Sequence, residues 1–186
     1  ILDVSKLEKM FDVIECCGVL HHMNNPSLGL SSLMMCLKPG GFIKLGIYSA
    51  IARKDIENAR RTIRELDING DPESIRKFRR NVQQGEFPDL LDLPSDFADF
   101  YSLSECRDLC FHVKEHRYTI NKMQELLESN NLSFCGFVLP ELIIDSYGRS
   151  YPKDTDKTSL SNWSSYELDN PLTFISMYQF WAKKSL

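Results

Sequence analysis

The first fifty residues alternate between short apolar runs and polar stretches, and this pattern predicts two buried strands. Phe11–Cys17 is a β-branched run that is apolar on both parities at Val13 and Ile14 and ends before Gly18. Such a run is typical of a strand that is covered on both faces. A second apolar run occupies residues 42–48, and it predicts a second strand of the same kind.

A helix is expected between the two strands. Asn25 is a good N-cap, Pro26 suits the first helical position, and apolar residues recur at helical spacing as far as Leu37. Pro39–Gly41 is expected to end this helix in a turn before the second strand. Strand, helix and strand in so short a stretch form a βαβ unit, which implies a parallel strand pair and a right-handed crossover.

From about residue 50 to about residue 130 the periodicity becomes helical. Pro88 and Pro94 mark residues 85–95 as a loop. Apolar residues at helical spacing predict two helices before this loop, at 56–66 and at 74–84. Two more are predicted after it, at 104–112 and from the N-cap Thr119 to about residue 127.

The last third of the chain contains two more apolar runs. The first predicts a strand at 132–139, and the second predicts a long aromatic strand at 172–181. The polar stretch between them, 145–170, is rich in Ser, Thr and Asp and is expected to be irregular or weakly helical. The chain as a whole therefore mixes strands and helices in the manner of an α/β fold.

Composition narrows the class of protein. The 186 residues are enough for one domain, and 42% hydrophobic with 26% charged residues is ordinary for a globular chain. A net charge of −4 gives no global basic field that would attract nucleic acid. No apolar run approaches the roughly 20 residues that cross a bilayer. From the charge and the short apolar runs we expect neither a nucleic-acid nor a membrane partner. The six cysteines lie mostly in apolar segments, so we expect reduced thiols and a cytoplasmic protein.

Two motifs flank the first helix and together carry a resemblance to a known family. Phe11–Met23 reads FDVIECCGVLHHM, and Leu37–Ile43 reads LKPGGFI. The first resembles the fourth-strand motif of class I S-adenosylmethionine-dependent methyltransferases, in which an FD-apolar strand leads into a VLHH turn. The second resembles the LKPGG entry to the family's fifth strand. A further stretch, 99–116, resembles a generic branch of these enzymes that is sometimes fused to tetratricopeptide repeats, so the resemblance allows for an upstream or fused repeat domain.

The resemblance implies an α/β fold in which the chain forms the C-terminal half of a Rossmann-like methyltransferase sheet. Residues 1–186 would be a partial domain with strands 4, 5, 6 and 7, and a helical insertion or lid at 50–130 would lie between strands 5 and 6. The last strand would be antiparallel and lie between the fifth and the sixth. The family's glycine-rich cofactor loop belongs to the half before Ile1, and no G-x-G-x-G sequence occurs here. We therefore expect this chain alone to bind the cofactor weakly or not at all.

The cofactor that the resemblance implies is S-adenosylmethionine. Ligands of open α/β sheets bind beyond the carboxyl ends of the strands, so the turn after strand 4 would face the methionine part. The adjacent His21 and His22 either line this pocket or cap the following helix, and a role as base is the alternative. The residues expected to bind the cofactor are Cys16, Cys17, Gly18, Val19, Leu20 and His22.

Methyl transfer to oxygen or nitrogen needs a base unless the acceptor is already nucleophilic. Glu115 with His112 or His116 would form a carboxylate–imidazole pair, which orients a base and raises its pKa. The alternative for this stretch is a surface helix end with polar partners. Tyr48, which ends the fifth strand, and Tyr101 are the candidate substrate contacts.

The same region contains two cysteines and two histidines, which could suggest zinc. On a continuous helix Cys106 and Cys110 would lie at about 0° and 40°, from about 100° per residue. His112 and His116 would lie at about 240° and 280°, so the four cannot converge on one ion unless the helix breaks. The spacing also lacks the paired C-x-x-C form of common structural zinc sites. No metal is therefore expected.

The resulting hypothesis is an enzyme that transfers the methyl group of S-adenosylmethionine to an unidentified small-molecule or protein acceptor. This segment would supply one cofactor wall and the acceptor pocket. Two other classes stay open: a non-catalytic or truncated methyltransferase-like binding module, and another nucleotide-binding α/β enzyme such as a dehydrogenase. The VLHH and LKPGG motifs and the lack of a nicotinamide signature argue against a dehydrogenase. A glycine-rich strand–turn–helix motif upstream would favour the enzyme over the binding module.

Overall fold

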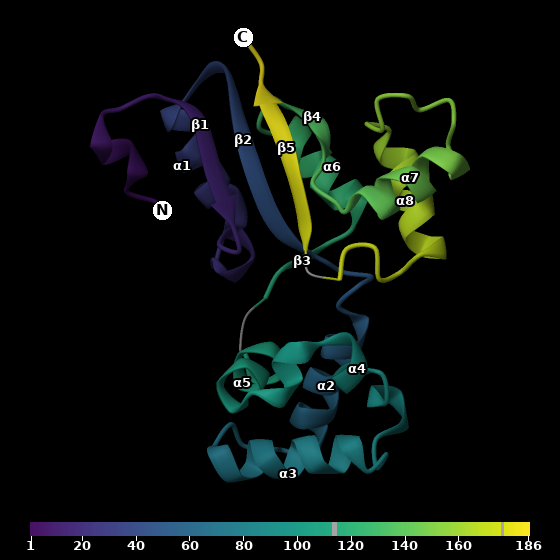
Figure 1. Ribbon diagram of the computed structural model, residues 1–186. Helices are drawn as coiled ribbons and strands as arrows, with labels where there is room; N and C mark the ends of the chain where they lie inside the picture. Colours follow the sequence, from purple (N-terminus) through teal and green to yellow (C-terminus); the bar gives the residue numbers. More distant parts are fainter. Residues whose placement is uncertain (113–114, 176) are drawn as a thin grey trace. The chain divides into compact units, whose positions relative to one another are not determined.

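The computed structural model describes residues 1–112, 115–175 and 177–186. The chain divides into two compact units, which are described separately below. The sheet unit comprises Ile1–Ala52 and Lys114–Leu186, and the inserted unit comprises Arg53–Val113. The first and last segments of the chain thus build one unit, and the second unit interrupts it in sequence (Figure 1).

The sheet unit is built on a mixed five-stranded sheet. Its strands are β1 (Phe11–Cys17), β2 (Leu37–Ser49), β3 (Arg117–Tyr118), β4 (Leu132–Phe137) and β5 (Tyr178–Lys184). Their order is β1-β2-β5-β4, and the short β3 pairs with the end of β2 (Figure 1). β1 and β2 are parallel, whereas β5 is antiparallel to both β2 and β4. The predicted α/β class and parallel pair are confirmed, and β5 lies between β2 and β4.

The turn expected at Pro39–Gly41 is instead part of β2, which begins directly after the first helix. The pairing register between β1 and β2 shifts between Phe11 and Val13, so β2 contains extra residues that form a bulge. Gly40 has φ +72°, a conformation that glycine adopts without the strain of a side chain. The glycines therefore bend the strand without ending it.

Two helices of the sheet unit begin at the residues that the sequence indicates. α1 (Pro26–Cys36) is capped by Asn25, whose side chain accepts a backbone N–H at 3.2 Å, and α6 (Ile120–Glu128) is capped by Thr119 at 3.3 Å. Both predicted caps are confirmed. The insertion expected at 50–130 included α6, but α6 belongs to the sheet unit because its apolar side chains pack on the sheet.

The last forty residues differ from the prediction in two ways. The stretch expected to be irregular or weakly helical contains most of α7 (Glu141–Ser150) and all of α8 (Leu160–Asp169). Tyr147 stacks on Trp163 with ring centroids 3.6 Å apart, and this buried stack joins the two helices. The final strand was expected from residue 172, but β5 begins six residues later because residues 171–174 form a turn.

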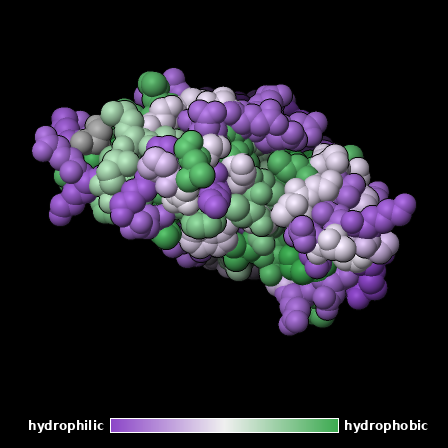
Figure 2. Space-filling view, turned by 90° about the horizontal axis from the view of Figure 1, so that it is seen from above, coloured by the Kyte–Doolittle hydropathy of each residue, from purple (hydrophilic) through white to green (hydrophobic). Residues whose placement is uncertain are grey.

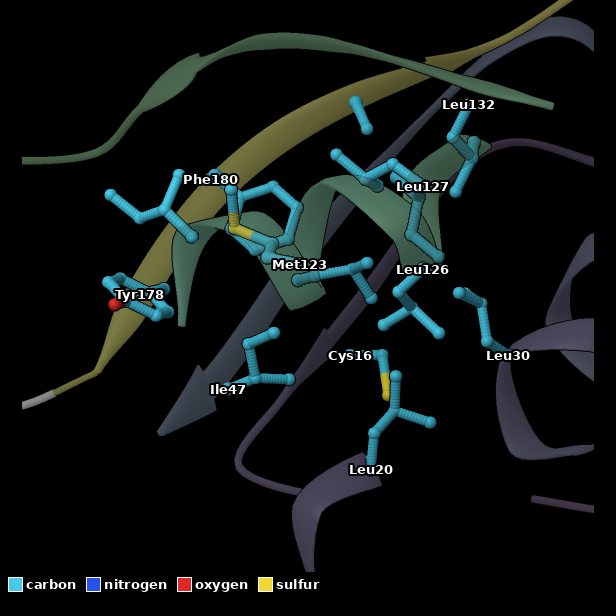
Figure 3. Close-up of a cluster of buried hydrophobic side chains, with 14 of the residues drawn as sticks. Cys16, Leu20, Leu30, Ile47, Met123, Leu126, Leu127, Leu132, Tyr178 and Phe180 are labelled. Carbon is cyan, nitrogen blue, oxygen red and sulfur yellow. The ribbon is translucent and has the colours of Figure 1, made fainter. Parts of the chain in front are cut away.

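The helices of the sheet unit cover one face of the sheet. Figure 3 shows Met123, Leu126 and Leu127 of α6 among the side chains that the strands present on this face. The strand residues buried there are Cys16, Ile43, Leu45, Ile47, Tyr178, Phe180 and Ala182. Val13 lies on the opposite face of β1 and is 54% exposed. The prediction that β1 is covered on both faces is therefore wrong for the described residues.

The inserted unit is helical. Its helices are α2 (Lys54–Glu65), α3 (Pro72–Gln83), α4 (Leu93–Asp96) and α5 (Leu103–Phe111). Buried apolar residues from several segments form its interior, among them Ile56, Phe78, Leu90 and Phe100. The guanidinium of Arg60 donates to the carbonyl oxygen of Leu109 at 2.7 and 3.1 Å, which ties α2 to α5. The expected loop at 85–95 contains a short 3₁₀ turn and the start of α4.

The surface and the thiols agree with an ordinary globular chain. None of the described helices is long and apolar enough to cross a membrane. The face drawn in Figure 2 is mainly hydrophilic, with hydrophobic residues in groups between the hydrophilic ones. All six cysteines are free thiols.

Candidate functional site

The candidate site lies where the parallel strands β1 and β2 end. The carboxyl ends of parallel strands meet at one edge of a sheet, which is where α/β proteins bind ligands. The segment after β1 turns through Gly18 into a 3₁₀ turn, Leu20–His22, and then reaches α1. β2 ends beside it at Ser49.

Gly18 gives this turn its shape. Its φ is +76°, and its N–H donates to the carbonyl of Gly46 in β2 at 3.1 Å. A Cβ atom at Gly18 would meet no atom within 4 Å outside its chain neighbours. The backbone here therefore borders open space, and a ligand can approach it closely.

The residues predicted to bind the cofactor divide into two groups. The side chains of Cys16 and Leu20 point into the hydrophobic core (Figure 3), and burial raises the pKa of the Cys16 thiol to about 11. Val19 is exposed, whereas Cys17 and His22 are half-buried. Their role as cofactor contacts stays a prediction, and only the second group has side chains at the surface.

Three aromatic rings brace the turn. The buried His21 stacks on Tyr48 of β2, with ring centroids 3.8 Å apart and planes 27° apart. His22 packs edge-on against both rings, at 4.4 Å from His21 and 5.9 Å from Tyr48. Tyr48, predicted as a substrate contact, thus packs its ring against the candidate cofactor turn and supports the turn's structure.

His116 fastens the same turn from another segment. Its backbone N–H donates to the carbonyl oxygen of His21 at 2.8 Å, and its Nε2 donates to that of Met23 at 3.0 Å. Glu115 lies beside it in the sheet unit, whereas His112 follows α5 in the inserted unit. Pairing of Glu115 with either histidine stays a prediction.

The inserted unit holds the remaining residues that the sequence singled out. Tyr101 is exposed, and its carbonyl oxygen accepts a hydrogen bond from Arg79. Cys106 and Cys110 are both buried on α5 and hydrogen-bond to each other. Within the part of the chain that the structure describes, no three His, Cys, Asp or Glu side chains are arranged to hold a metal ion.

A buried carboxylate that sequence reasoning missed lies at the end of β2. Glu167 of α8 is 1% exposed and accepts hydrogen bonds from the hydroxyls of Ser49, at 2.6 Å, and Tyr178, at 2.6 and 2.7 Å. Burial raises the pKa of Glu167, although both hydroxyls act to lower it. No local pattern marks this cluster, because Ser49 lies 118 residues before Glu167 in sequence.

Comparisons with known proteins bear on the fold. No family model matches the chain. An uncharacterized protein from Synechococcus sp. is 30% identical over 178 residues, a match that covers 89% of this chain and 42% of that protein. Two structures of PKMT2 from Rickettsia typhi, one of them in complex with AdoHcy, match 98% of this chain with a TM-score of 0.67 and 13% identity.

The chain thus has the fold of one part of a longer protein. It spans 42% of the Synechococcus protein and 36–37% of the two PKMT2 chains. At 13% identity the likeness to PKMT2 extends to the fold and no further.

Proposed function

We propose that the protein containing this segment is an S-adenosylmethionine-dependent methyltransferase. The observation that carries the proposal is the match of 98% of the chain to PKMT2 in complex with AdoHcy, the product that S-adenosylmethionine leaves after methyl transfer. The FDVIECCGVLHHM and LKPGG motifs support it independently, because they resemble methyltransferase motifs in order and spacing. In this proposal β1, β2, β4 and β5 correspond to strands 4, 5, 6 and 7 of a Rossmann-like sheet, and the other half of that sheet lies upstream.

The turn after β1 fits the cofactor in chemistry and position. Gly18 leaves its backbone open to a ligand, and Val19 adds an exposed apolar side chain. Both lie at the carboxyl edge of a parallel strand pair, the usual ligand edge of such sheets. When bound, the cofactor supplies an electrophilic methyl group, and this segment supplies one wall that binds and orients it.

The acceptor side of the proposal concerns the inserted unit and the segment that follows it. Residues 53–113 select the acceptor, with Tyr101 as a contact. His112 or His116 is the candidate base, and Glu115 is the carboxylate that would orient it. Nε2 of His116 already donates to a carbonyl oxygen, so a proton taken by this residue would go to Nδ1. Exchanging residues 53–113 between relatives should change acceptor preference, and an unchanged preference would contradict this assignment.

The decisive experiment is binding of S-adenosylmethionine by the protein made from its complete gene, measured by calorimetry. Gly18→Val should weaken binding about tenfold or more, or about 1.4 kcal/mol, because the side chain occupies the open space beside the turn. Gly85→Val is the matched control, since Gly85 also has a positive φ, +77°, but lies in the inserted unit.

Three outcomes of this measurement decide between the readings. Absence of binding by the unaltered protein at millimolar cofactor would rule out the proposal. Equal losses in Gly18→Val and Gly85→Val would remove the turn from the site. Tight binding without methyl transfer to any of a panel of small-molecule and peptide acceptors would favour the non-catalytic binding module.

A further inference from the structure

The buried cluster of Glu167, Ser49 and Tyr178 has a geometry that bears on the proposed cofactor turn. Ser49 Oγ accepts the backbone N–H groups of Ile51 and Ala52 at 3.1 and 3.0 Å. With both lone pairs engaged, its own proton is directed at Glu167, 2.6 Å away. The end of β2 is therefore held by three hydrogen bonds that converge on a single hydroxyl.

Tyr178 of β5 completes the cluster. Its hydroxyl lies 2.7 and 2.6 Å from the two carboxylate oxygens of Glu167, and its position in β5 is directly opposite Ile47 of β2. Figure 3 shows Tyr178 and Ile47 on the same side of the sheet. The carboxylate thus receives hydrogen bonds from both hydroxyls and ties α8 to the ends of β2 and β5.

The next residue along β2 connects this cluster to the turn. Tyr48 precedes Ser49, and its ring stacks on the buried His21 at 3.8 Å. His21 belongs to the 3₁₀ turn after Gly18, and its carbonyl oxygen also accepts the N–H of His116. A shift at Ser49 would move Tyr48, and with it the ring against which the turn is packed.

We propose that Glu167 is a positioning residue for the cofactor turn: it fixes Ser49, and through the Tyr48–His21 stack it holds Gly18–His22 in the ligand-binding shape. The proposal rests on the proposed function for its consequence, which is cofactor affinity. Its structural half, control of the Tyr48–His21 stack, does not depend on that function. Burying a carboxylate costs stability, and the hydrogen bonds from Ser49 and Tyr178 offset part of this cost.

The test compares two tyrosines that each donate to a carboxylate. Tyr178→Phe removes the bond to Glu167, whereas Tyr147→Phe removes the bond from Tyr147 to Asp154, which joins α7 to the following loop. In the protein made from its complete gene, Glu167→Gln and Tyr178→Phe should raise the Kd for S-adenosylmethionine, measured by calorimetry, about five- to thirtyfold. Tyr147→Phe should leave this Kd within about twofold.

A second measurement separates the two proposals. The NMR signal of the His21 imidazole carbons is shifted by the stacked Tyr48 ring, and this shift should diminish in Glu167→Gln and Tyr178→Phe but persist in Tyr147→Phe. If the unaltered protein binds no cofactor yet the shift responds in this way, the proposed function fails and the positioning role stands. An unchanged shift, or equal effects of Tyr147→Phe and Tyr178→Phe on the Kd, would overturn the positioning role. Should Glu167→Gln fail to fold, Tyr178→Phe and Ser49→Ala carry the same test.

Discussion

The two faces of the sheet differ sharply in what they present. On the helix-covered face, residues in register across β1, β2 and β5 are apolar and buried, as Cys16, Leu45 and Phe180 illustrate. On the other face, Glu15 pairs with Lys44 at 2.9 Å, and Lys183 lies over the ring of Phe42 at 5.6 Å. One face is a core and the other is a surface of mixed charge and apolar rings.

The contrast shows what each face contributes to the candidate site. Two buried side chains stabilise the turn from within the core: Cys16, near the end of β1, and Leu20, in the turn itself. Gly18 and Val19 are left at the surface, where a ligand can reach them. The core therefore fixes the shape of the turn, and the open positions are the ones available for recognition.

The largest effect that separates the two faces should come from the centre of the core. Leu45→Ala removes a fully buried side chain between Cys16 and Phe180, and it should lower the free energy of unfolding by about 2–5 kcal/mol. Phe42→Ala, on the open face of the same strand, should cost less than half as much although the side chain is larger. Urea unfolding of both variants measures the difference, and equal losses would contradict the assignment of the faces.

Local signals in the sequence were sufficient for part of this architecture. The caps Asn25 and Thr119 and the β-branched run of β1 are read from neighbouring residues, and they predicted the elements correctly. The alternation of side chains also predicts which residues share a face. It does not reveal whether anything covers that face, which is why Val13 was misjudged.

The parts that could not be predicted depend on contacts between distant segments. Glu167 and Ser49 are 118 residues apart in sequence, and no spacing rule links them. The helix α8 that carries Glu167 contains many serines and polar residues, so its period is weak, and packing of Trp163 on Tyr147 supplies what propensity does not. For the cofactor turn, the motif located the segment, but only the structure separates core-facing from open positions.

The buried carboxyl of Glu167, at the end of the covered face, should make the free energy of unfolding depend on pH. Burial raises the pKa of Glu167 above its ordinary value of 4.5, so the folded protein holds this proton more tightly than the unfolded chain. Its contribution to stability is therefore fully present below pH 4.5 and is lost as the pH rises through the raised pKa. The stability of the unaltered protein relative to Glu167→Gln should therefore fall as the pH rises above about 4.5. The free energy of unfolding of both proteins, measured as a function of pH, checks this. A constant difference between the two proteins would contradict the prediction.

The smallest effect tests the open face itself. Val13 and Ile14 are neighbours on β1, but Val13 is 54% exposed and Ile14 packs against the core. In this chain Val13→Ser should change the free energy of unfolding by no more than about 0.5 kcal/mol, because the side chain is largely in water already. Ile14→Ser should cost clearly more, since it places a hydroxyl against apolar neighbours. If Val13→Ser is neutral in this chain but costly in the protein made from its complete gene, then the open face is covered there, and the difference between the two faces belongs to the segment and not to the whole protein.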